Sequence, residues 1–158
     1  MRTTILEGKD LDVTGDALQS ALVDLLDLSL QAKQAHWNVS GPLFRELHLQ
    51  LDEVVELARE HADTVAERAA ALGQAPDGRA STLSGSRQGP DVGPGELSDQ
   101  KVIDDFSDLL GQTAARMRER IADTETADPV SQDLFIGITG DLEKQAWFFR
   151  SHRIGGRG

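Results

Sequence analysis

Cysteine and tyrosine are absent from the 158-residue sequence, and aromatic residues make up only 4% of it. Without cysteine, the chain forms neither a disulfide framework nor a thiolate metal site or nucleophile. Few aromatic rings argue against a base-stacking platform for nucleic acid. No apolar run approaches the ~20 residues of a membrane span, and the first residues lack the apolar core of a signal peptide. We therefore expect one cytoplasmic domain, residues 1–158, with no membrane partner.

Positive charge is also scarce. The chain has 16 lysine and arginine residues against 27 aspartate and glutamate residues, which gives a formal net charge of −11. A body this anionic attracts cations and repels DNA phosphates and anionic membranes. The charge balance therefore favours a cation as the ligand over nucleic acid.

Four long stretches have the apolar spacing of amphipathic helices, and no strand-like alternation is present. Thr14 is the predicted N-cap of the first stretch, and Asp128 followed by Pro129 starts the last one. Residues 1–14 and the basic residues 151–158 are the predicted tails. The predicted helices cover residues 15–39, 42–72, 98–124 and 128–150.

A glycine- and proline-rich stretch, residues 73–97, separates the second and third predicted helices. Loops of this length usually hold a short helix or have a function of their own. In a four-helix bundle, a long link at this point is the crossover of ferritin-like topology. The sequence therefore predicts an all-α, ferritin-like four-helix bundle with a short helix in the crossover. Gly137 and Gly140 predict close helix contact in the fourth helix, with a weak or kinked helix as the alternative.

Potential metal ligands gather on one face of the second predicted helix. At about 100° per residue they share an arc of roughly 100°. The four residues are His48, Asp52, Asp63 and Glu67. His36 ends the first helix, and the tight turn at 40–42 brings it alongside. Imidazole and carboxylate without sulfur suit iron, manganese or zinc; the alternative for the carboxylates is a solvated acidic face.

The spacing of these residues divides them into two half-sites. Asp52 and Asp63 are about 16 Å apart along the helix axis, whereas ligands lie about 2 Å from a metal ion. One chain therefore cannot use both aspartates around one ion. The half-sites are His48 with Asp52, and Asp63 with Glu67, each pair one helical turn apart.

A second copy of the chain, antiparallel across a two-fold axis, unites the half-sites. The axis crosses the second helix between Leu57 and Ala58. It sets each ligand opposite one from the other copy: His48 opposite Glu67, and Asp52 opposite Asp63. Two-fold interfaces are self-complementary in this way, so the sequence predicts two equivalent metal sites shared between chains, each completed by His36.

A di-iron site inside a single bundle is the competing design. It needs Glu-x-x-His pairs on two helices, but the positions three residues before His36 and His48 hold Lys33 and Arg45. The sequence therefore does not predict an intra-bundle site.

Three further polar residues, two of them histidines, lie outside the predicted ligand set. Arg59 falls on the same stripe, about 20° from His48, where it could form salt bridges with the carboxylates. His61 lies on the far side of the helix and is interpreted as a surface residue. His152 is interpreted as a tail residue.

These motifs resemble those of the Dps family, the DNA-binding proteins from starved cells. The signature is KQAHWNVSGPLFRELHLQLDE followed by HADTVAERAAALG, and DLEKQAWFFR is similar to the closing motif of that family. The resemblance covers residues 16–150. It implies a hollow dodecamer of four-helix subunits with a short helix in the long loop.

The resemblance also implies a chemistry. It implies ferroxidase sites at two-fold interfaces, where Fe(II) is oxidised, preferentially by hydrogen peroxide, and ferric mineral is stored in the cavity. The matching iron ligands are His36, His48 and Asp52 from one chain, with Asp63 and Glu67 from the partner. Removing both reactants in this way protects DNA from hydroxyl radical.

Other residues have roles that the resemblance suggests. Trp37 is either a trap for stray radicals or an interface contact, and Trp147 is interpreted as packing. Acidic three-fold pores of the family lie near the turn between the third and fourth helices. The pore candidates here are Asp123, Asp128 and Asp133, and the alternative is helix capping by Asp128 with solvated acids.

DNA binding is a second hypothesis, in which the protein compacts the nucleoid and the metal site is secondary. The first ten residues have balanced charges, whereas the last nine, RSHRIGGRG, contain three arginines and no acid. Three charges per tail could add up across many copies, but they oppose an acidic shell. The third hypothesis is a plain helical oligomer with no chemistry.

Overall fold

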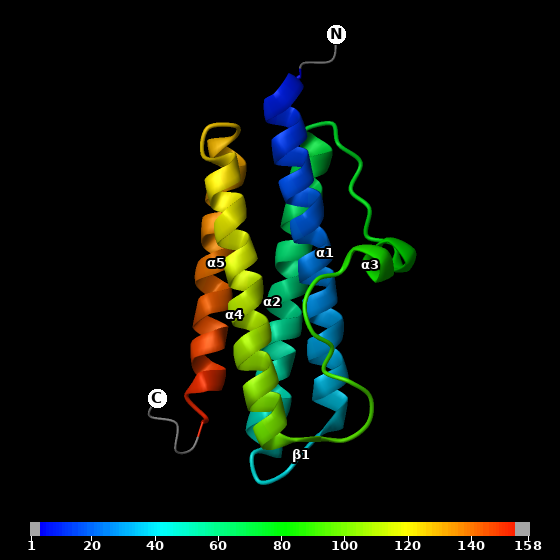
Figure 1. The fold of residues 1–158 in the computed structure, drawn as a ribbon, viewed down its shortest axis with the longest axis vertical. Coiled ribbons are helices and arrows are strands. Elements are labelled where there is room, and N and C mark those ends of the chain that lie inside the picture. Colours follow the sequence, from blue (N-terminus) through cyan, green and yellow to red (C-terminus); the bar gives the residue numbers. More distant parts are fainter. Residues whose placement is uncertain (1–3, 154–158) are drawn as a thin grey trace.

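Four long helices pack side by side in the computed structural model, which describes residues 4–153. α1 lies along α2 and α4 lies along α5, and the two hairpins associate through α1 with α4 and α2 with α5 (Figure 1). The elements are α1 (Gly8–Asn38), β1 (Val39–Ser40), α2 (Phe44–Ala71), α3 (Ala80–Ser86), β2 (Leu97–Ser98), α4 (Asp99–Thr124) and α5 (Pro129–Arg150). The predicted all-α bundle with a long crossover is confirmed.

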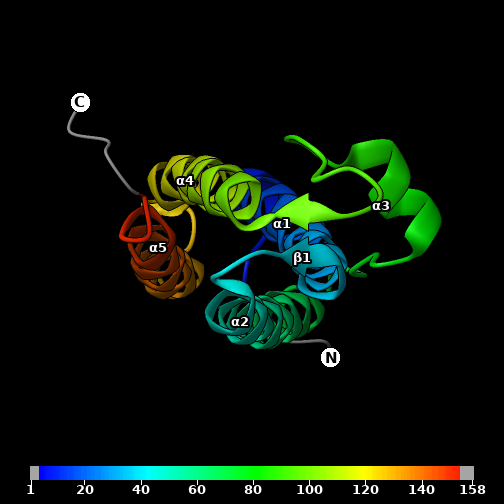
Figure 2. The same ribbon diagram turned by 90° about the horizontal axis from the view of Figure 1, so that it is seen from below.

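The apolar stripes of the four helices meet in one core. The view along the bundle shows the four helices grouped around a common centre (Figure 2). Fully buried side chains include Leu25 of α1 and Leu51 of α2, together with three phenylalanines. The rings of Phe106 and Phe149 lie 5.4 Å apart between α4 and α5. Each such side chain contributes about 1.5–3 kcal/mol by leaving water, so burial along the stripes holds these long helices in place.

The helix α1 begins at Gly8, and the predicted start at Gly15 with Thr14 as N-cap is wrong. Thr14 is instead fully buried within the helix. Leu11 packs against the core, so the additional helical residues continue the apolar stripe. Residues 8–14 therefore belong to α1 rather than to a tail. The starts of α4 and α5 agree with prediction, because Ser98 and Asp128 accept hydrogen bonds from the backbone of the first turn.

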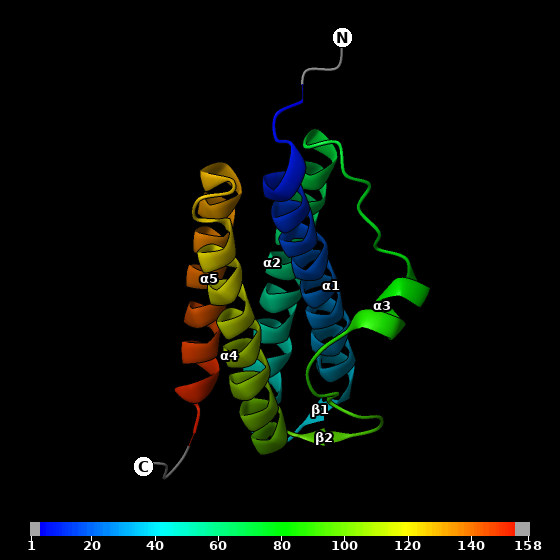
Figure 3. The same cartoon turned by 45° about the horizontal axis from the view of Figure 1, so that its top comes forward.

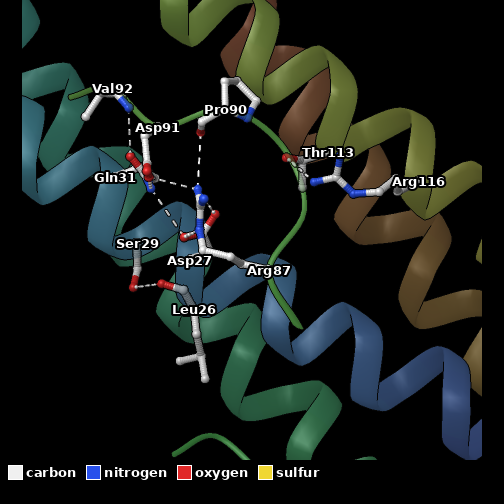
Figure 4. Close-up of polar contacts among 10 residues, drawn as sticks. All are labelled: Leu26, Asp27, Ser29, Gln31, Arg87, Pro90, Asp91, Val92, Thr113 and Arg116. Atoms are coloured by element: carbon white, nitrogen blue, oxygen red, sulfur yellow. Dashed lines mark hydrogen bonds and ion pairs between the residues drawn. The ribbon is translucent and has the colours of Figure 1, made fainter. Parts of the chain in front are cut away.

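The crossover carries the expected short helix, α3, which contacts α1 (Figure 3). A polar cluster fastens the following segment to α1 (Figure 4). The Arg87 guanidinium donates to the buried Asp27 carboxylate, with Nε–Oδ1 at 2.9 Å. Gln31 donates to Asp91 and accepts a hydrogen bond from the backbone of Val92. The crossover is thus held to the bundle by charge and hydrogen bonds.

Two short strands, which the sequence pattern did not indicate, tie the end of the crossover to the α1–α2 turn. β1 and β2 are parallel, with Val39 opposite Leu97. Two residues are too few to produce visible alternation. Gly41 in this turn has a φ of +120°, and an added Cβ would lie 2.7 Å from the Asp99 carboxylate. That carboxylate also accepts a hydrogen bond from the backbone of Leu43, so the turn is fixed against the start of α4.

The helix α5 runs without interruption through Gly137 and Gly140. A Cβ added at either glycine would meet nothing within 4 Å. The close helix contact predicted there is therefore wrong within this chain. No helix in residues 4–153 has the length and apolar character needed to cross a membrane.

Candidate metal centre

His36 and His48 form a reciprocal pair where α1 turns into α2. The Nδ1 atom of His36 lies 2.7 Å from the backbone oxygen of His48, and Nδ1 of His48 lies 2.8 Å from the backbone oxygen of His36. Because a carbonyl oxygen only accepts, both Nδ1 atoms carry the hydrogen. In the neutral ring, Nε2 then carries the lone pair with which histidine binds a metal.

Local structure holds the two imidazoles in this arrangement. The rings stack with centroids 3.6 Å apart and planes 17° apart. The ring of Phe44 lies 5.0 Å from that of His48. His36 is buried by this packing, with 7% of its surface exposed. The pair is therefore oriented before any ligand arrives.

Asp52 lies one helical turn after His48, and its carboxylate lies near the Nδ1 side of the His36 ring. Its Oδ1 atom is 2.6 Å from Lys33 Nζ and 3.5 Å from His36 Nδ1. The hydrogen bond from Lys33 lowers the pKa of Asp52, aided by the nearby histidines and opposed by partial burial. The carboxylate is therefore ionised near neutral pH, and an ammonium group neutralises it.

Asp63 and Glu67 lie towards the other end of α2 and away from the histidines. Both side chains are exposed. Within the described part of the chain they form no ion pair and accept no side-chain hydrogen bond. In residues 4–153, no three histidine, aspartate or glutamate side chains meet in an arrangement that could hold a metal ion. The single chain thus keeps Asp63 and Glu67 apart from the histidines, and His36, His48 and Asp52 do not by themselves form a metal-binding group.

Other predicted residues have mixed outcomes. His61 is not a free surface residue. Its Nε2 atom lies 2.8 Å from Asp141 Oδ2, and this contact links α2 to α5. Arg59 is exposed and forms no ion pair with any residue between 4 and 153. Trp37 has 68% of its surface exposed, whereas Trp147, predicted to pack, is 55% exposed.

Asp128 caps the start of α5. It is buried, and its carboxylate accepts hydrogen bonds from Arg68, at 2.7 Å, and from the backbone of Ser131. Burial favours a higher pKa for Asp128, but the bonds from Arg68 and Ser131 together hold it below its ordinary value. The capping alternative is therefore correct for this residue. Asp123 and Asp133 are exposed and remain pore candidates.

Sequence reasoning missed Lys33 as the partner of Asp52. The signal was available, because Lys33 precedes His36 by three residues and therefore lies on the same face of α1.

The chain matches the ferritin-like domain over residues 15–153. The bundle and its long crossover therefore define a ferritin-like protein. A DNA protection during starvation protein of Mycolicibacterium smegmatis is 37% identical over 93% of this chain and 80% of its own length. DNA protection during starvation protein 2 of Deinococcus radiodurans is 38% identical over 90% of this chain. The chain belongs to the Dps family.

A solved structure supports this assignment. The tetragonal form of Mycobacterium smegmatis Dps superimposes with a TM-score of 0.92 at 37% identity, covering 99% of this chain and 98% of that one. The chain aligns with only 59% of the length of DNA protection during starvation protein 2 of Deinococcus radiodurans.

Proposed function

We propose that this protein is a ferroxidase and iron-storage protein that oxidises Fe(II), preferentially with hydrogen peroxide, at sites shared between two chains. The observation that carries the proposal is the histidine pair. Two stacked imidazoles have their Nδ1 atoms engaged by backbone oxygens, which leaves their Nε2 atoms for a metal, and the ionised Asp52 carboxylate lies 3.5 Å from His36 Nδ1. Such a donor set suits a divalent transition metal.

The second half of the proposed site comes from a second copy. With the two-fold axis between Leu57 and Ala58, the partner's Asp63 faces Asp52 and the partner's Glu67 faces His48. The exposure of these two carboxylates supports the proposal, because they are available to another chain. His36 completes the ligand set.

The proposed residues have distinct tasks. The imidazoles position Fe(II), and the hard carboxylates favour the Fe(III) product. Two electrons from two Fe(II) ions reduce one hydrogen peroxide to water, so hydroxyl radical is not released. Few protein ligands per ion leave coordination positions open for the oxidant. Trp37 next to His36 is proposed either to intercept stray radicals or to pack at the interface.

We place the reaction in a hollow dodecamer whose cavity stores the ferric mineral. Twelve copies with a net charge of −11 each concentrate cations around the shell. The names of the relatives refer to DNA protection. Here we attribute protection to removal of iron and peroxide, in the cytoplasm, with Asp123 and Asp133 as candidates for the iron entrance.

DNA binding is the weaker candidate for this chain. Arg153 of the C-terminal segment already pairs with Asp104 at 3.1 Å and with Asp108, which leaves less free positive charge. Arg157 lies outside the described residues. A gel shift at about 50 mM salt tests this alternative: a shift that weakens steeply with salt supports it, and no shift rejects it.

A rapid-mixing assay tests the ferroxidase. Fe(II) is added without oxygen, hydrogen peroxide follows, and ferric absorbance is recorded. We expect fast oxidation by the native protein and the buffer rate for a His36→Ala, His48→Ala double variant. His152→Ala is the matched control, because this histidine follows α5 and is not one of the proposed ligands. Native protein no faster than buffer, or an unaffected double variant, would reject the proposal.

A further inference from the structure

Glu56 and Arg59 are opposite charges one turn apart on α2, between the two half-sites. Both side chains are exposed, and neither forms an ion pair with another residue between 4 and 153. At about 100° per residue, Glu56 lies about 80° and Arg59 about 20° around the helix from His48. Both therefore lie on the stripe that carries the proposed ligands.

The surroundings of Arg59 do not neutralise its charge. Arg59 lines a cavity of about 450 Å³ between α1, α2 and α3, together with Arg87. Arg87 is already held by Asp27 and Asp91, at 2.9 and 3.0 Å (Figure 4). Neither of these carboxylates forms an ion pair with Arg59 in the described structure. Arg59 is thus an exposed cation that is available to a carboxylate of another chain.

The position of the pair shows where that carboxylate comes from. Glu56 and Arg59 are centred on the point between Leu57 and Ala58, which is also the centre of both proposed ligand pairs. Because the three pairs share this centre, each is symmetric around the helix about one direction, about 50° from His48, and all six residues lie on that side of the helix. A two-fold axis at that level, beside the helix and at right angles to that direction, therefore sets Arg59 at the level of the partner's Glu56 on the facing stripe.

We infer that Glu56 and Arg59 form two symmetry-related ion pairs across the interface between two copies and fix the register that unites the half-sites. This inference rests on the antiparallel register of the proposed function. Two-fold contacts are self-complementary in this manner, and complementary charge sets register more than it adds affinity. Arg59 and Glu56 are positioning residues and do not bind iron.

The pair is well placed for this task. Each member lies only about 2 Å along the helix from the axis, whereas His48 and Glu67 lie about 14 Å from it. A change in crossing angle hardly moves the ion pairs but displaces the ligands. The two ion pairs can therefore keep the same contacts over a range of crossing angles between the two copies of α2.

Two charge reversals test the pairing. In an Arg59→Glu chain both positions are negative, and in a Glu56→Arg chain both are positive. We expect each variant alone to associate at least about tenfold more weakly, with partial recovery at high salt. Analytical ultracentrifugation over a range of protein concentrations measures this. Glu53→Arg is the matched control, because this exposed glutamate of α2 lies about 140° around the helix from His48, outside the arc of the stripe.

Mixing the two variants gives the decisive result. In a mixed dimer, both contacts across the axis join an acid to a base, so we expect assemblies containing both chains and native affinity. A salt bridge within one helix predicts no such rescue, because each variant chain carries like charges at both positions. Mixed chains that stay apart, or single variants that associate like the native protein, would overturn the inference.

The same measurements separate this inference from the proposed function. Association state alone reports the pairing, so rescue by mixing without any iron oxidation would uphold the pairing and reject the ferroxidase. Native association by both reversals, with iron oxidation that still requires His36 and His48, would reject the pairing alone.

Discussion

The two ends of α2 differ in how far one chain organises them. At the first end, His48 is held by His36, and Asp52 is held by Lys33. At the other end, Asp63 and Glu67 are exposed and make no side-chain contacts of this kind in the described structure. The side chains of one half of the proposed site are therefore held in place when the monomer folds, although they do not yet form a metal-binding group, and the other half is left for assembly. Such a division would confine iron oxidation to assembled protein.

The largest effect expected from this difference is complementation between inactive chains. One variant carries His36→Ala and His48→Ala, and the other carries Asp63→Ala and Glu67→Ala. Each alone should oxidise iron at the buffer rate. After the two are refolded together in equal amounts, random pairing makes half of the dimers mixed, and each mixed dimer has one intact site. About one quarter of the native activity should return.

The control for this experiment is the same pair of proteins mixed without unfolding. No activity should return if the chains do not exchange. Activity in either variant alone would contradict sharing between chains, as would the lack of recovery in assemblies shown by mass to contain both chains.

The second-largest expected effect is on stability, and it concerns the contact that anchors the end of α2 carrying Asp63 and Glu67. Arg68, next to Glu67, holds the buried Asp128 at the start of α5. Arg68→Met leaves that carboxylate without its cation, so the free energy of unfolding should fall by about 3 kcal/mol near neutral pH. Urea denaturation at fixed protein concentration measures the loss. Unchanged stability would mean that Arg68 does not anchor this end.

The pH dependence of the Arg68 effect has a definite sign. The pKa of Asp128 lies below its ordinary 3.8 in the folded protein. The stability that this depression contributes is present above 3.8 and is lost as the pH falls through the lower, folded value. The gap between native protein and Arg68→Met should therefore narrow in acid. A gap that widens there would contradict the assigned role of Asp128.

Sequence reasoning succeeded where periodicity or capping determines the result. It predicted the bundle, the short helix in the crossover, and the starts of α4 and α5 at Ser98 and Asp128. It failed at the start of α1, since Thr14 looked like a cap although the apolar stripe continues before it. The cap preference of a threonine is weaker than the burial of another helical turn.

The candidate site could be predicted only in part, for physical reasons. Helical geometry places His48 and Asp52 on one face, but it does not specify the reciprocal hydrogen bonds with His36, which depend on the turn at 39–43. Contacts between distant segments, such as Val39 with Leu97 and His61 with Asp141, leave no local pattern. The shared half of the site stays a prediction.

The third effect tests the turn that brings the histidines together. Gly41→Ala introduces a Cβ 2.7 Å from Asp99 at a φ of +120°. It should cost about 1–3 kcal/mol and slow iron oxidation by shifting His48 relative to His36. Gly137→Ala is the control, because its Cβ would meet nothing within 4 Å, and it should stabilise α5 by up to about 1 kcal/mol. Equal melting temperatures for the two variants would contradict this account.

The smallest effect concerns the ammonium group at the preformed half. Lys33 must leave Asp52 before that carboxylate can bind a metal, and pairs as exposed as this one contribute about 0–1 kcal/mol. Lys33→Met should therefore tighten Co(II) binding by up to about fivefold at neutral pH, as measured by calorimetry. The gain should shrink in acid, because without Lys33 the pKa of Asp52 returns towards its ordinary value and protons compete with the metal. Weaker Co(II) binding at neutral pH would show instead that Lys33 organises the carboxylate for the metal, so that even the preformed half depends on more than its three ligands.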